Sequence, residues 1–318
     1  MPMVDMPLEQ LRQYEGITPC PEYFDAYWTQ ALDEMRAVDP QVALTPAAFQ
    51  ASGVECFDLT FTGVGGARIY AKYLRPVRRK MCPAQLFFHG YMGNTGDWSD
   101  YLGLALSGVC VAAMDCRGQG GRSQDAGGVS GTTGRGHIIR GLEEGPHALL
   151  FRRIMLDTAQ LAALVMHFDE VDPARVGTAG GSQGGGLALA CASLEPRIDR
   201  VAAQYPFLCD YQRVWVMDLA KDAYEELLYY FRAFDPLHER EQEIFTTLGY
   251  IDIKNMVHRI RGKVLFAATQ MDVICPPSTQ FAAFNRITAP KELVLYPDFG
   301  HELLPGWSDR VYQFFVEG

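Results

Sequence analysis

The stretch Gly180-Gly181-Ser182-Gln183-Gly184 decides the fold of this chain. An apolar, strand-forming run at residues 175–179 leads into it, and small and apolar residues with a helical pattern follow at 187–192. A strand that turns sharply into a helix leaves no room for a Cβ atom two residues before or after the apex, which accounts for Gly180 and Gly184. The apex residue takes a strained backbone conformation that lifts its side chain above the sheet edge. The stretch therefore predicts a nucleophile elbow with Ser182 as the nucleophile.

A serine of this kind needs a histidine base, and in such folds the chain order is Ser, then Asp or Glu, then His. The chain has seven histidines, and His301 fits best because it lies on the loop after the last predicted strand, at residues 293–296. A base on that loop reaches the elbow. The other histidines outside the early strands either precede the serine or fall in helical patterns that favour a structural role: His137, His147, His167, His238 and His258.

The acid that orients the histidine is expected at the end of the preceding strand. Residues 264–268 are typical of a buried parallel strand, and Asp272 follows at its carboxyl end, the edge where open α/β sheets place catalytic groups. Asp298 is an alternative, because it lies three residues before His301 on the same loop. Its position after Pro297 is equally typical of a turn residue. We expect Asp272 to be the acid.

Two main-chain donors are expected to hold the oxyanion of an acyl-transfer reaction. One is the N–H of Gln183, directly after the nucleophile at the start of a helix. The other is the N–H of Tyr91, because the strand at 85–88 ends in a glycine-containing loop that begins with His89. We interpret His89 as a structural residue that supports this loop.

Composition limits the functions that this chain can have. Hydrophobic residues make up 48% and charged residues 21% of its 318 residues, which is ordinary for a globular enzyme. A formal net charge of −10 argues against nucleic acid or an anionic membrane as a partner. The eight cysteines show no metal-ligand spacing, and the chain opens without a basic and apolar leader. These features predict a cytoplasmic protein without metal or cofactor.

The alternation of strands and helices predicts a single α/β domain over residues 1–318, with a mostly parallel sheet covered by helices on both faces. Residues 1–50 form a predicted N-terminal arm with one helix at 21–38. Residues 117–147 carry ten glycines and predict a long functional or interface loop. Residues 207–260 show several amphipathic helical patterns and predict a helical cap over the site, with plain surface packing as the alternative. The remaining predicted strands lie at 56–62, 67–75, 109–114 and 201–204, and the remaining helices at 98–107, 149–168 and 278–285.

Three motifs together resemble those of carbohydrate esterase family seven, the acetyl xylan esterase and cephalosporin C deacetylase family of the α/β-hydrolase superfamily. They are Arg117-Gly118-Gln119, the elbow at 180–184, and His301-Glu302. The resemblance implies an α/β-hydrolase fold and the catalytic roles given above for Ser182, His301 and Asp272, with Tyr91 and Gln183 as oxyanion donors. It also implies a supporting role for the remaining motif residues: Arg117, Gly118, Gln119, Gly180, Gly184 and Glu302.

The same resemblance implies an activity and an assembly. A member of this family removes acetyl groups from small sugar esters and from cephalosporin C without a metal, and forms a hexamer whose contacts use the glycine-rich loop. From the residues themselves we expect Arg117 to pair with a carboxylate such as Glu302 and so to hold the His301 loop.

Three other functions remain open on the sequence. A peptidase of the prolyl-oligopeptidase type shares the elbow and the order of the triad, although residues 1–50 are too short for the propeller such enzymes carry. A general short-chain carboxylesterase would use the same residues with a wider pocket. A non-catalytic hydrolase-fold binding protein is disfavoured because all three members of the triad are present.

Overall fold

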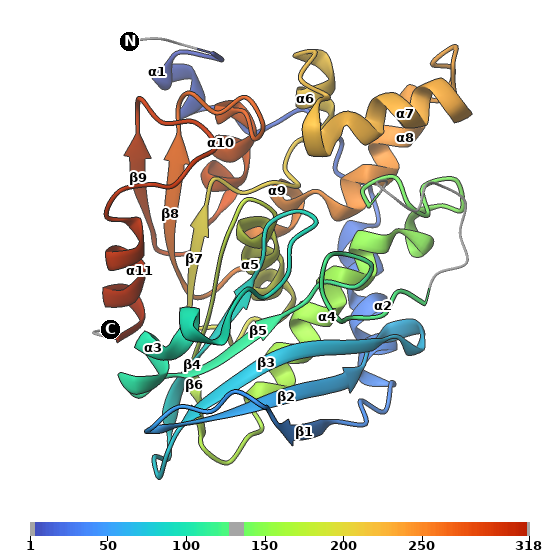
Figure 1. Ribbon diagram of the computed structural model, residues 1–318. Helices are drawn as coiled ribbons and strands as arrows, with labels where there is room; N and C mark the ends of the chain where they lie inside the picture. The colour runs from blue at the N-terminus through green and yellow to red at the C-terminus, as the bar shows by residue number, and fades with distance from the viewer. Residues whose placement is uncertain (1–3, 127–136, 317–318) are drawn as a thin grey trace.

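A nine-stranded sheet crosses the computed structural model, which describes residues 4–126 and 137–316 (Figure 1). In spatial order the strands are β1-β2-β3-β5-β4-β6-β7-β8-β9. Their bounds are β1 Ala43–Pro46, β2 Val54–Thr62, β3 Arg68–Pro76, β4 Cys82–Phe88, β5 Cys110–Met114, β6 Val171–Gly181, β7 Arg200–Gln204, β8 Lys263–Thr269 and β9 Lys291–Tyr296.

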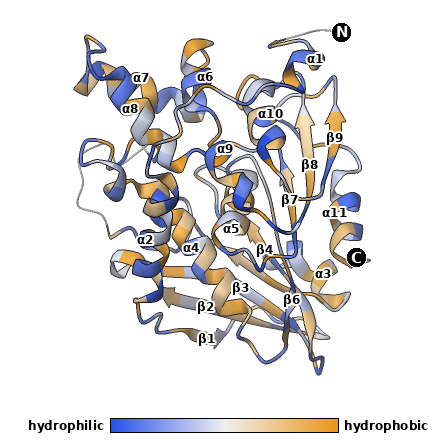
Figure 2. Ribbon diagram, turned by 180° about the vertical axis from the view of Figure 1, so that it is seen from behind, coloured by the Kyte–Doolittle hydropathy of each residue, from blue (hydrophilic) through white to orange (hydrophobic). Residues whose placement is uncertain are grey.

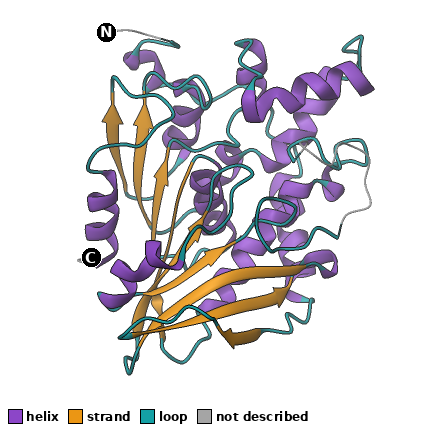
Figure 3. Cartoon of the chain, viewed as in Figure 1, coloured by secondary structure: helices purple, strands orange, loops and turns teal. Residues whose placement is uncertain are grey.

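The α-helices alternate with these strands over much of the chain (Figure 3). Their bounds are α1 Leu8–Leu11, α2 Phe24–Arg36, α3 Leu102–Leu106, α4 Leu150–Val165, α5 Gln183–Leu194, α6 Tyr211–Val216, α7 Glu225–Phe234, α8 Glu241–Leu248, α9 Ile253–Met256, α10 Pro277–Arg286 and α11 Trp307–Val316. A short 3₁₀ helix, η2, spans Trp98–Tyr101 just before α3.

The sheet is antiparallel at one end and parallel from the centre onward. Strands β1, β2, β3 and β5 pair antiparallel, whereas β5, β4, β6, β7, β8 and β9 pair parallel in that spatial order. Parallel strands place their carboxyl ends at one edge of the sheet, so the loops after β4, β6, β8 and β9 converge there. Each of these four loops carries one of the residues predicted for the site.

Both faces of the sheet are covered by helices, as the sequence predicts (Figures 1 and 2). Successive residues of β8 point to opposite faces: Val264 and Phe266 join the large core beneath α4, α5 and α10. Leu265 and Ala267 pack instead with Trp307 and Phe315 of α11. Because both faces are apolar, the central strands are continuous hydrophobic runs rather than alternating ones.

The N-terminal arm is tied to distant parts of the chain by buried polar contacts. The Tyr14 hydroxyl and the backbone N–H groups of Ile17 and Thr18 all donate to the carboxylate of Asp210. In return the buried ammonium of Lys254 donates to the carbonyl of Thr18 at 2.6 Å. The N-terminal arm is therefore held by two charged residues of the second half of the chain, Asp210 and Lys254.

Most predicted elements occur with shifted ends, and two differ in kind. The predicted helix at 98–107 is divided into η2 and α3, and strand β1 was not predicted. The described parts of the glycine-rich segment, 117–126 and 137–147, consist of turns and bends until the 3₁₀ turn that begins at Pro146, and its residues 127–136 lie outside the described residues. Residues 207–260 contain α6 to α9, with α6, α7 and α8 at the upper right of Figure 1.

In the described residues, no helix combines the length and apolar character needed to cross a membrane.

Candidate active site

The elbow at Ser182 has the strained geometry expected of it. Ser182 has φ 56° and ψ −121°, between the end of β6 and the start of α5. A Cβ on Gly180 would overlap the backbone of Gly184, and a Cβ on Gly184 would overlap the carbonyl oxygen of Phe88. Both glycines are therefore required by close backbone approach, and the half-buried serine stands at the carboxyl edge of the sheet.

A continuous series of hydrogen bonds joins the three residues of the predicted triad. His301 Nε2 lies 3.0 Å from Ser182 Oγ, and His301 Nδ1 lies 2.8 Å from Asp272 Oδ2. His301 keeps a fifth of its side chain exposed, whereas Asp272 is fully buried. Asp298, the alternative acid, is exposed to solvent. The side chains are arranged so that a proton can pass from the serine to the imidazole while the carboxylate fixes the ring.

Main-chain donors hold the Asp272 carboxylate in place. Its Oδ1 atom accepts hydrogen bonds from the N–H groups of Ile274 and Cys275, both at 2.8 Å. Its Oδ2 atom is thereby left to His301, with a further weak contact from the Thr269 hydroxyl at 3.5 Å. The tight turn after β8 therefore sets the position of the acid.

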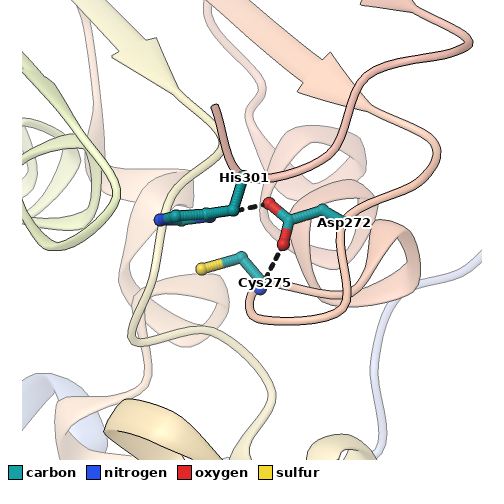
Figure 4. Close-up of side chains that lie close together, drawn as sticks. All are labelled: Asp272, Cys275 and His301. Atoms are coloured by element: carbon teal, nitrogen blue, oxygen red, sulfur yellow. Dashed lines mark hydrogen bonds and ion pairs between the residues drawn. The ribbon is translucent and has the colours of Figure 1, made fainter. Parts of the chain in front are cut away.

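Cys275 brings a buried thiol close to the triad (Figure 4). One ligand-type atom of each of Asp272, Cys275 and His301 lies within 4.8 Å of the other two, a grouping that could hold a metal ion. The carboxylate and the imidazole already bond each other, and burial raises the pKa of the Cys275 thiol well above its usual value. A metal here would have to displace the proton shared by the triad, so the arrangement fits nucleophilic catalysis better than metal binding.

His89 supports the predicted oxyanion loop. Its Nε2 atom accepts a hydrogen bond from the N–H of Cys116, and its Nδ1 atom lies 2.7 Å from the carbonyl of Gly90. Burial lowers the pKa of His89, which keeps the ring neutral with the proton on Nδ1. This agrees with the structural role predicted for His89.

Gln119 bridges the two predicted halves of the oxyanion hole. Its Oε1 atom accepts from the N–H of Met92 at 2.9 Å and from Gln183 Nε2 at 3.0 Å, and its Nε2 atom donates to Gln183 Oε1 at 2.8 Å. Met92 adjoins Tyr91, so one amide holds both donor-bearing segments. Within residues 4–126 and 137–316, the N–H groups of Tyr91 and Gln183 donate no hydrogen bond to the protein.

Replacing Gln119 by leucine should lower kcat on acetyl esters by about 10- to 100-fold, because a small misplacement of transition-state donors has a large effect on rate. KM should change little, since the amide contacts the loop and not the ester. Steady-state kinetics would measure both. Gln119→Glu keeps the oxygen that accepts from Met92, so its kcat should fall less. Gln313 is exposed, and Gln313→Leu is the matched control. A kcat for Gln119→Leu equal to that of wild type would show that the bridge does not position the donors.

Arg117 does not pair with Glu302, and the prediction of that pair was wrong. The guanidinium, fully buried, makes two hydrogen bonds to Asp157 of α4, at 2.6 and 2.7 Å, and one to the carbonyl of Val64. A buried guanidinium needs a buried carboxylate, and the exposed Glu302 cannot supply one. Burial raises the pKa of Asp157, and the Arg117 charge opposes that rise.

Glu302 and Gly118 have local roles instead. The Glu302 carboxylate accepts from the N–H of Gly300, and its backbone carbonyl accepts from the Tyr205 hydroxyl at 2.9 Å. Gly118, at φ 71°, reverses the chain between Arg117 and Gln119. Arg117 thus fixes this turn to α4, and the turn presents Gln119 to the oxyanion loop.

Three residues make contacts around the site that were not predicted from the sequence. Asp157 is the partner of Arg117. A single acid in the apolar helical pattern at 149–168 was the one sequence feature that could have indicated a buried ion pair there. The Tyr205 ring packs 4.5 Å from the His301 ring, and the His137 ring makes an edge contact with Tyr91 at 5.2 Å. Nothing in the local sequence signals these last two contacts.

His137 predicts a pH dependence of stability. It is 5% exposed, and burial, with a smaller effect of Arg140, lowers its pKa from 6.5 to about 4. The unfolded chain therefore binds a proton between these values that the folded chain does not, so stability is full above about pH 6.5 and falls as the pH falls toward 4. The expected loss of unfolding free energy between pH 7 and pH 5 is about 2 kcal/mol. In urea unfolding, the free energy of unfolding of His137→Gln should fall between pH 7 and pH 5 by about 2 kcal/mol less than that of wild type. If the two proteins lose the same amount, His137 is not the source of the pH dependence.

The fold and the site together define a class. A mostly parallel sheet with a nucleophile elbow after β6, an acid after β8 and a histidine after β9 is that of an α/β hydrolase. Solved structures of hydrolases, an esterase and peptidases that are 14 to 18% identical to this chain share the fold alone.

The chain belongs to the acetyl xylan esterase (AXE1) family, whose model matches residues 1–317. Among solved structures, acetyl xylan esterase 1 from Thermoanaerobacterium sp. JW/SL YS485 is 58% identical, with a TM-score of 0.97 over 98% of this chain and 99% of that one. The acetyl xylan esterase from Paenibacillus sp. R4 is 34% identical, with a TM-score of 0.92 and the same coverage.

A curated relative is the acetyl esterase Axe7A of Xylanibacter ruminicola, 26% identical over 295 residues. The match covers 91% of this chain, which spans 64% of the length of that relative. Family membership places the chain among the carboxylic ester hydrolases.

Proposed function

We propose that this chain is a serine esterase that removes acetyl groups from small acetylated substrates, including acetylated xylo-oligosaccharides and cephalosporin C. The observation that carries the proposal is the hydrogen-bonded series from Asp272 through His301 to Ser182. The acetyl specificity rests on the family and on the acetyl xylan esterase that is 58% identical.

In the proposed reaction Ser182 Oγ attacks the ester carbonyl while His301 Nε2 takes the serine proton. The tetrahedral intermediate collapses, the alcohol leaves with the proton from Nε2, and an acetyl-enzyme remains on Ser182. Water activated by His301 then releases acetate. Asp272 stays ionised and stabilises the imidazolium that forms in each half of the reaction.

The oxyanion in both steps is assigned to the N–H groups of Tyr91 and Gln183. Main-chain donors that are already oriented need no reorganisation as charge develops, and each is worth about 10²- to 10³-fold in rate. The bridge through Gln119 supports this role, because it links the segments on which both donors lie. Every step uses side-chain and main-chain groups of this chain, without metal or cofactor.

We further propose that residues 207–260 cover the site on the side of the leaving alcohol, and that the active form is a hexamer. The ring of Phe207, at the start of that segment, packs 5.7 Å from the ring of Tyr91, which supports the cap. The hexamer rests on the resemblance to carbohydrate esterase family seven. Light scattering on the purified protein would give the mass of the assembly directly.

The proposed activity is tested by kcat/KM on a series of esters from acetyl to octanoyl. A sharp preference for acetyl supports a deacetylase, and acetylated xylo-oligosaccharides and cephalosporin C would then be compared as substrates. A flat or long-chain profile would overturn the acetyl assignment and indicate a general carboxylesterase. A chromogenic prolyl peptide in the same assay separates an esterase from a peptidase, and labelling of Ser182 by an active-serine phosphonate separates an enzyme from a binding protein.

A further inference from the structure

A cavity of about 450 Å³ lies between α3 and α11, two helices that are neighbours at the lower left of Figure 1. Phe87 of β4 packs with the apolar cluster of α3 and with that of α11, so both helices cover the same face of the sheet. The ends of β4, β6 and β7 form the floor of the cavity. None of Ser182, Asp272 and His301 lines it. The cavity is therefore separate from the triad, and its volume lies within the range of about 300 to 1,000 Å³ that small-molecule sites have.

The inner part of this cavity is apolar and partly aromatic. Phe87 and Trp307 line it, together with small residues of β6 and β7. Tyr312 of α11 lines it as well, and its hydroxyl is hydrogen-bonded to the hydroxyl of Ser107 at the end of α3. This bond joins the two helices beside the cavity and holds the Tyr312 ring in place. The C–H groups of a ring-shaped ligand pack well on aromatic side chains of this kind, because the face of an aromatic ring carries partial negative charge.

Three polar side chains of the lining have hydrogen-bonding groups to spare. The half-buried amide of Gln204 makes no hydrogen bond to any residue that the structure describes, and neither does the hydroxyl of the exposed Ser308. Asp100 accepts from the N–H of Asp97 at 2.9 Å through Oδ2, while its Oδ1 atom accepts from no residue of 4–126 or 137–316. An amide, a hydroxyl and a carboxylate oxygen are therefore available to a ligand, and together they offer both donors and acceptors.

The charges at this cavity favour a neutral ligand. Asp100 is the one charged residue among the described residues that line it, so an anion would meet a carboxylate and no cation. Burial lowers the pKa of the nearby Lys72, and Asp100 is among the carboxylates that oppose this shift, so the Asp100 charge is partly compensated outside the cavity. A plain hydrocarbon ring would leave the Gln204 amide without a partner. A neutral ring that carries several hydroxyl groups satisfies both the aromatic and the polar parts of the lining.

We propose that this cavity is a non-catalytic binding site for a neutral saccharide, with a sugar ring against Phe87 and Tyr312 and its hydroxyl groups on Gln204 and Asp100. The proposal does not depend on the proposed ester hydrolysis, because it concerns sugars that carry no ester. The bound saccharide lies behind the elbow, since Gly181 also lines the cavity. The protein then holds a sugar chain at a place other than the one where chemistry occurs.

Calorimetry with four probes tests the kind of ligand. Xylobiose has sugar rings with several hydroxyl groups, xylitol has the hydroxyl groups without a ring, benzyl alcohol has a ring with a single hydroxyl group, and benzylamine has a ring with a positive charge. Xylobiose should bind at millimolar concentration, and each of the other three should bind about 10-fold more weakly or not at all. No binding of xylobiose, or equal binding of any of the other three probes, overturns the proposal.

Two variants locate the binding. Gly103 of α3 lines the cavity, and a Cβ atom there would meet nothing within 4 Å, so Gly103→Leu fills the cavity without a clash. Leucine also favours a helix more than glycine does, so this variant should fold, and it should weaken xylobiose binding by about 10-fold or more. Gln204→Leu removes the amide at similar size and should weaken binding by about 3- to 10-fold.

Gln313→Leu is the matched control for the glutamine change. Gln313 is exposed, lies on α11 beside Tyr312 and does not line the cavity, so this variant should bind xylobiose as wild type does. Urea unfolding of each variant shows that the protein titrated is folded, and Gly103→Leu keeps the test valid if Gln204→Leu is not. Full binding by Gly103→Leu would place the sugar elsewhere, for example at the triad, and would overturn the proposal. Full binding by a folded Gln204→Leu would do the same.

Discussion

Replacing Ser182 by alanine should lower kcat/KM for acetyl esters by about 10⁵- to 10⁶-fold, because the nucleophile and its base act as one unit. In His301→Ala, kcat/KM should fall by about the same factor. In the double variant Ser182→Ala with His301→Ala it should fall scarcely further, since either change alone removes the covalent route. Steady-state kinetics on an acetyl ester, with active-site titration to correct for trace wild-type enzyme, would measure the loss.

The same variant separates chemistry from structure. Ser182 is half-buried and its backbone, rather than its hydroxyl, makes the contacts that hold the elbow, through its N–H to Gln204 and its carbonyl to Phe207. Because alanine keeps these bonds, the free energy of unfolding should stay close to that of wild type. Substantial activity retained in Ser182→Ala would mean that another group is the nucleophile, and the proposed mechanism would fail.

Replacing Asp157 by asparagine should destabilise the protein by about 3 to 5 kcal/mol, because it leaves the Arg117 guanidinium buried without a counter-charge. Both partners of this pair are fully buried. The Gln119 turn depends on the same anchor, so kcat should fall as well. Urea unfolding, with the midpoint and the slope fitted separately, would measure the stability.

A double variant distinguishes the ion pair from simple packing. Arg117→Met with Asp157→Leu removes both charges and should recover most of the stability lost by Asp157→Asn, since apolar replacement of a buried pair is often close to neutral. The exposed pair of Asp33 with Arg36 is the control, and Asp33→Asn should change stability by no more than about 0.5 kcal/mol. Equal stability of Asp157→Asn and wild type would show that the pair contributes no net stabilisation.

The sequence predicts the elbow, the acid and the base because each depends on local pattern. Gly180 and Gly184 indicate that two backbone segments approach closely. Asp272 and His301 each follow a strand that is evident as an apolar run in the sequence. Position along a parallel strand already implies position in space, since all carboxyl ends meet at one edge. The edge strand β1 has no such run, because its residues are mostly exposed.

Pairings across long separations could not be predicted in the same way. Arg117 and Asp157 are 40 residues apart, and no spacing rule says which of many carboxylates a buried guanidinium meets. Gln119 and Gln183 are 64 residues apart, and an amide carries no charge to suggest its partner. The thiol of Cys275 lies near the triad because of how the turn after β8 closes, which depends on the hydrogen bonds to Asp272 rather than on residue type. These contacts depend on how distant segments pack against one another. Sequence pattern indicates which residues are buried but not which of them meet.

The anchoring of the N-terminal arm has a consequence for the order in which this protein is made. Tyr14 and Thr18 meet Asp210 across 196 and 192 residues, and Thr18 meets Lys254 across 236. A ribosome adds about 5 to 20 residues per second, so the arm waits on the order of 10 to 50 s before Lys254 has even been added to the chain. The arm therefore precedes its partners in synthesis by that interval, and it reaches its native place only after they have been made.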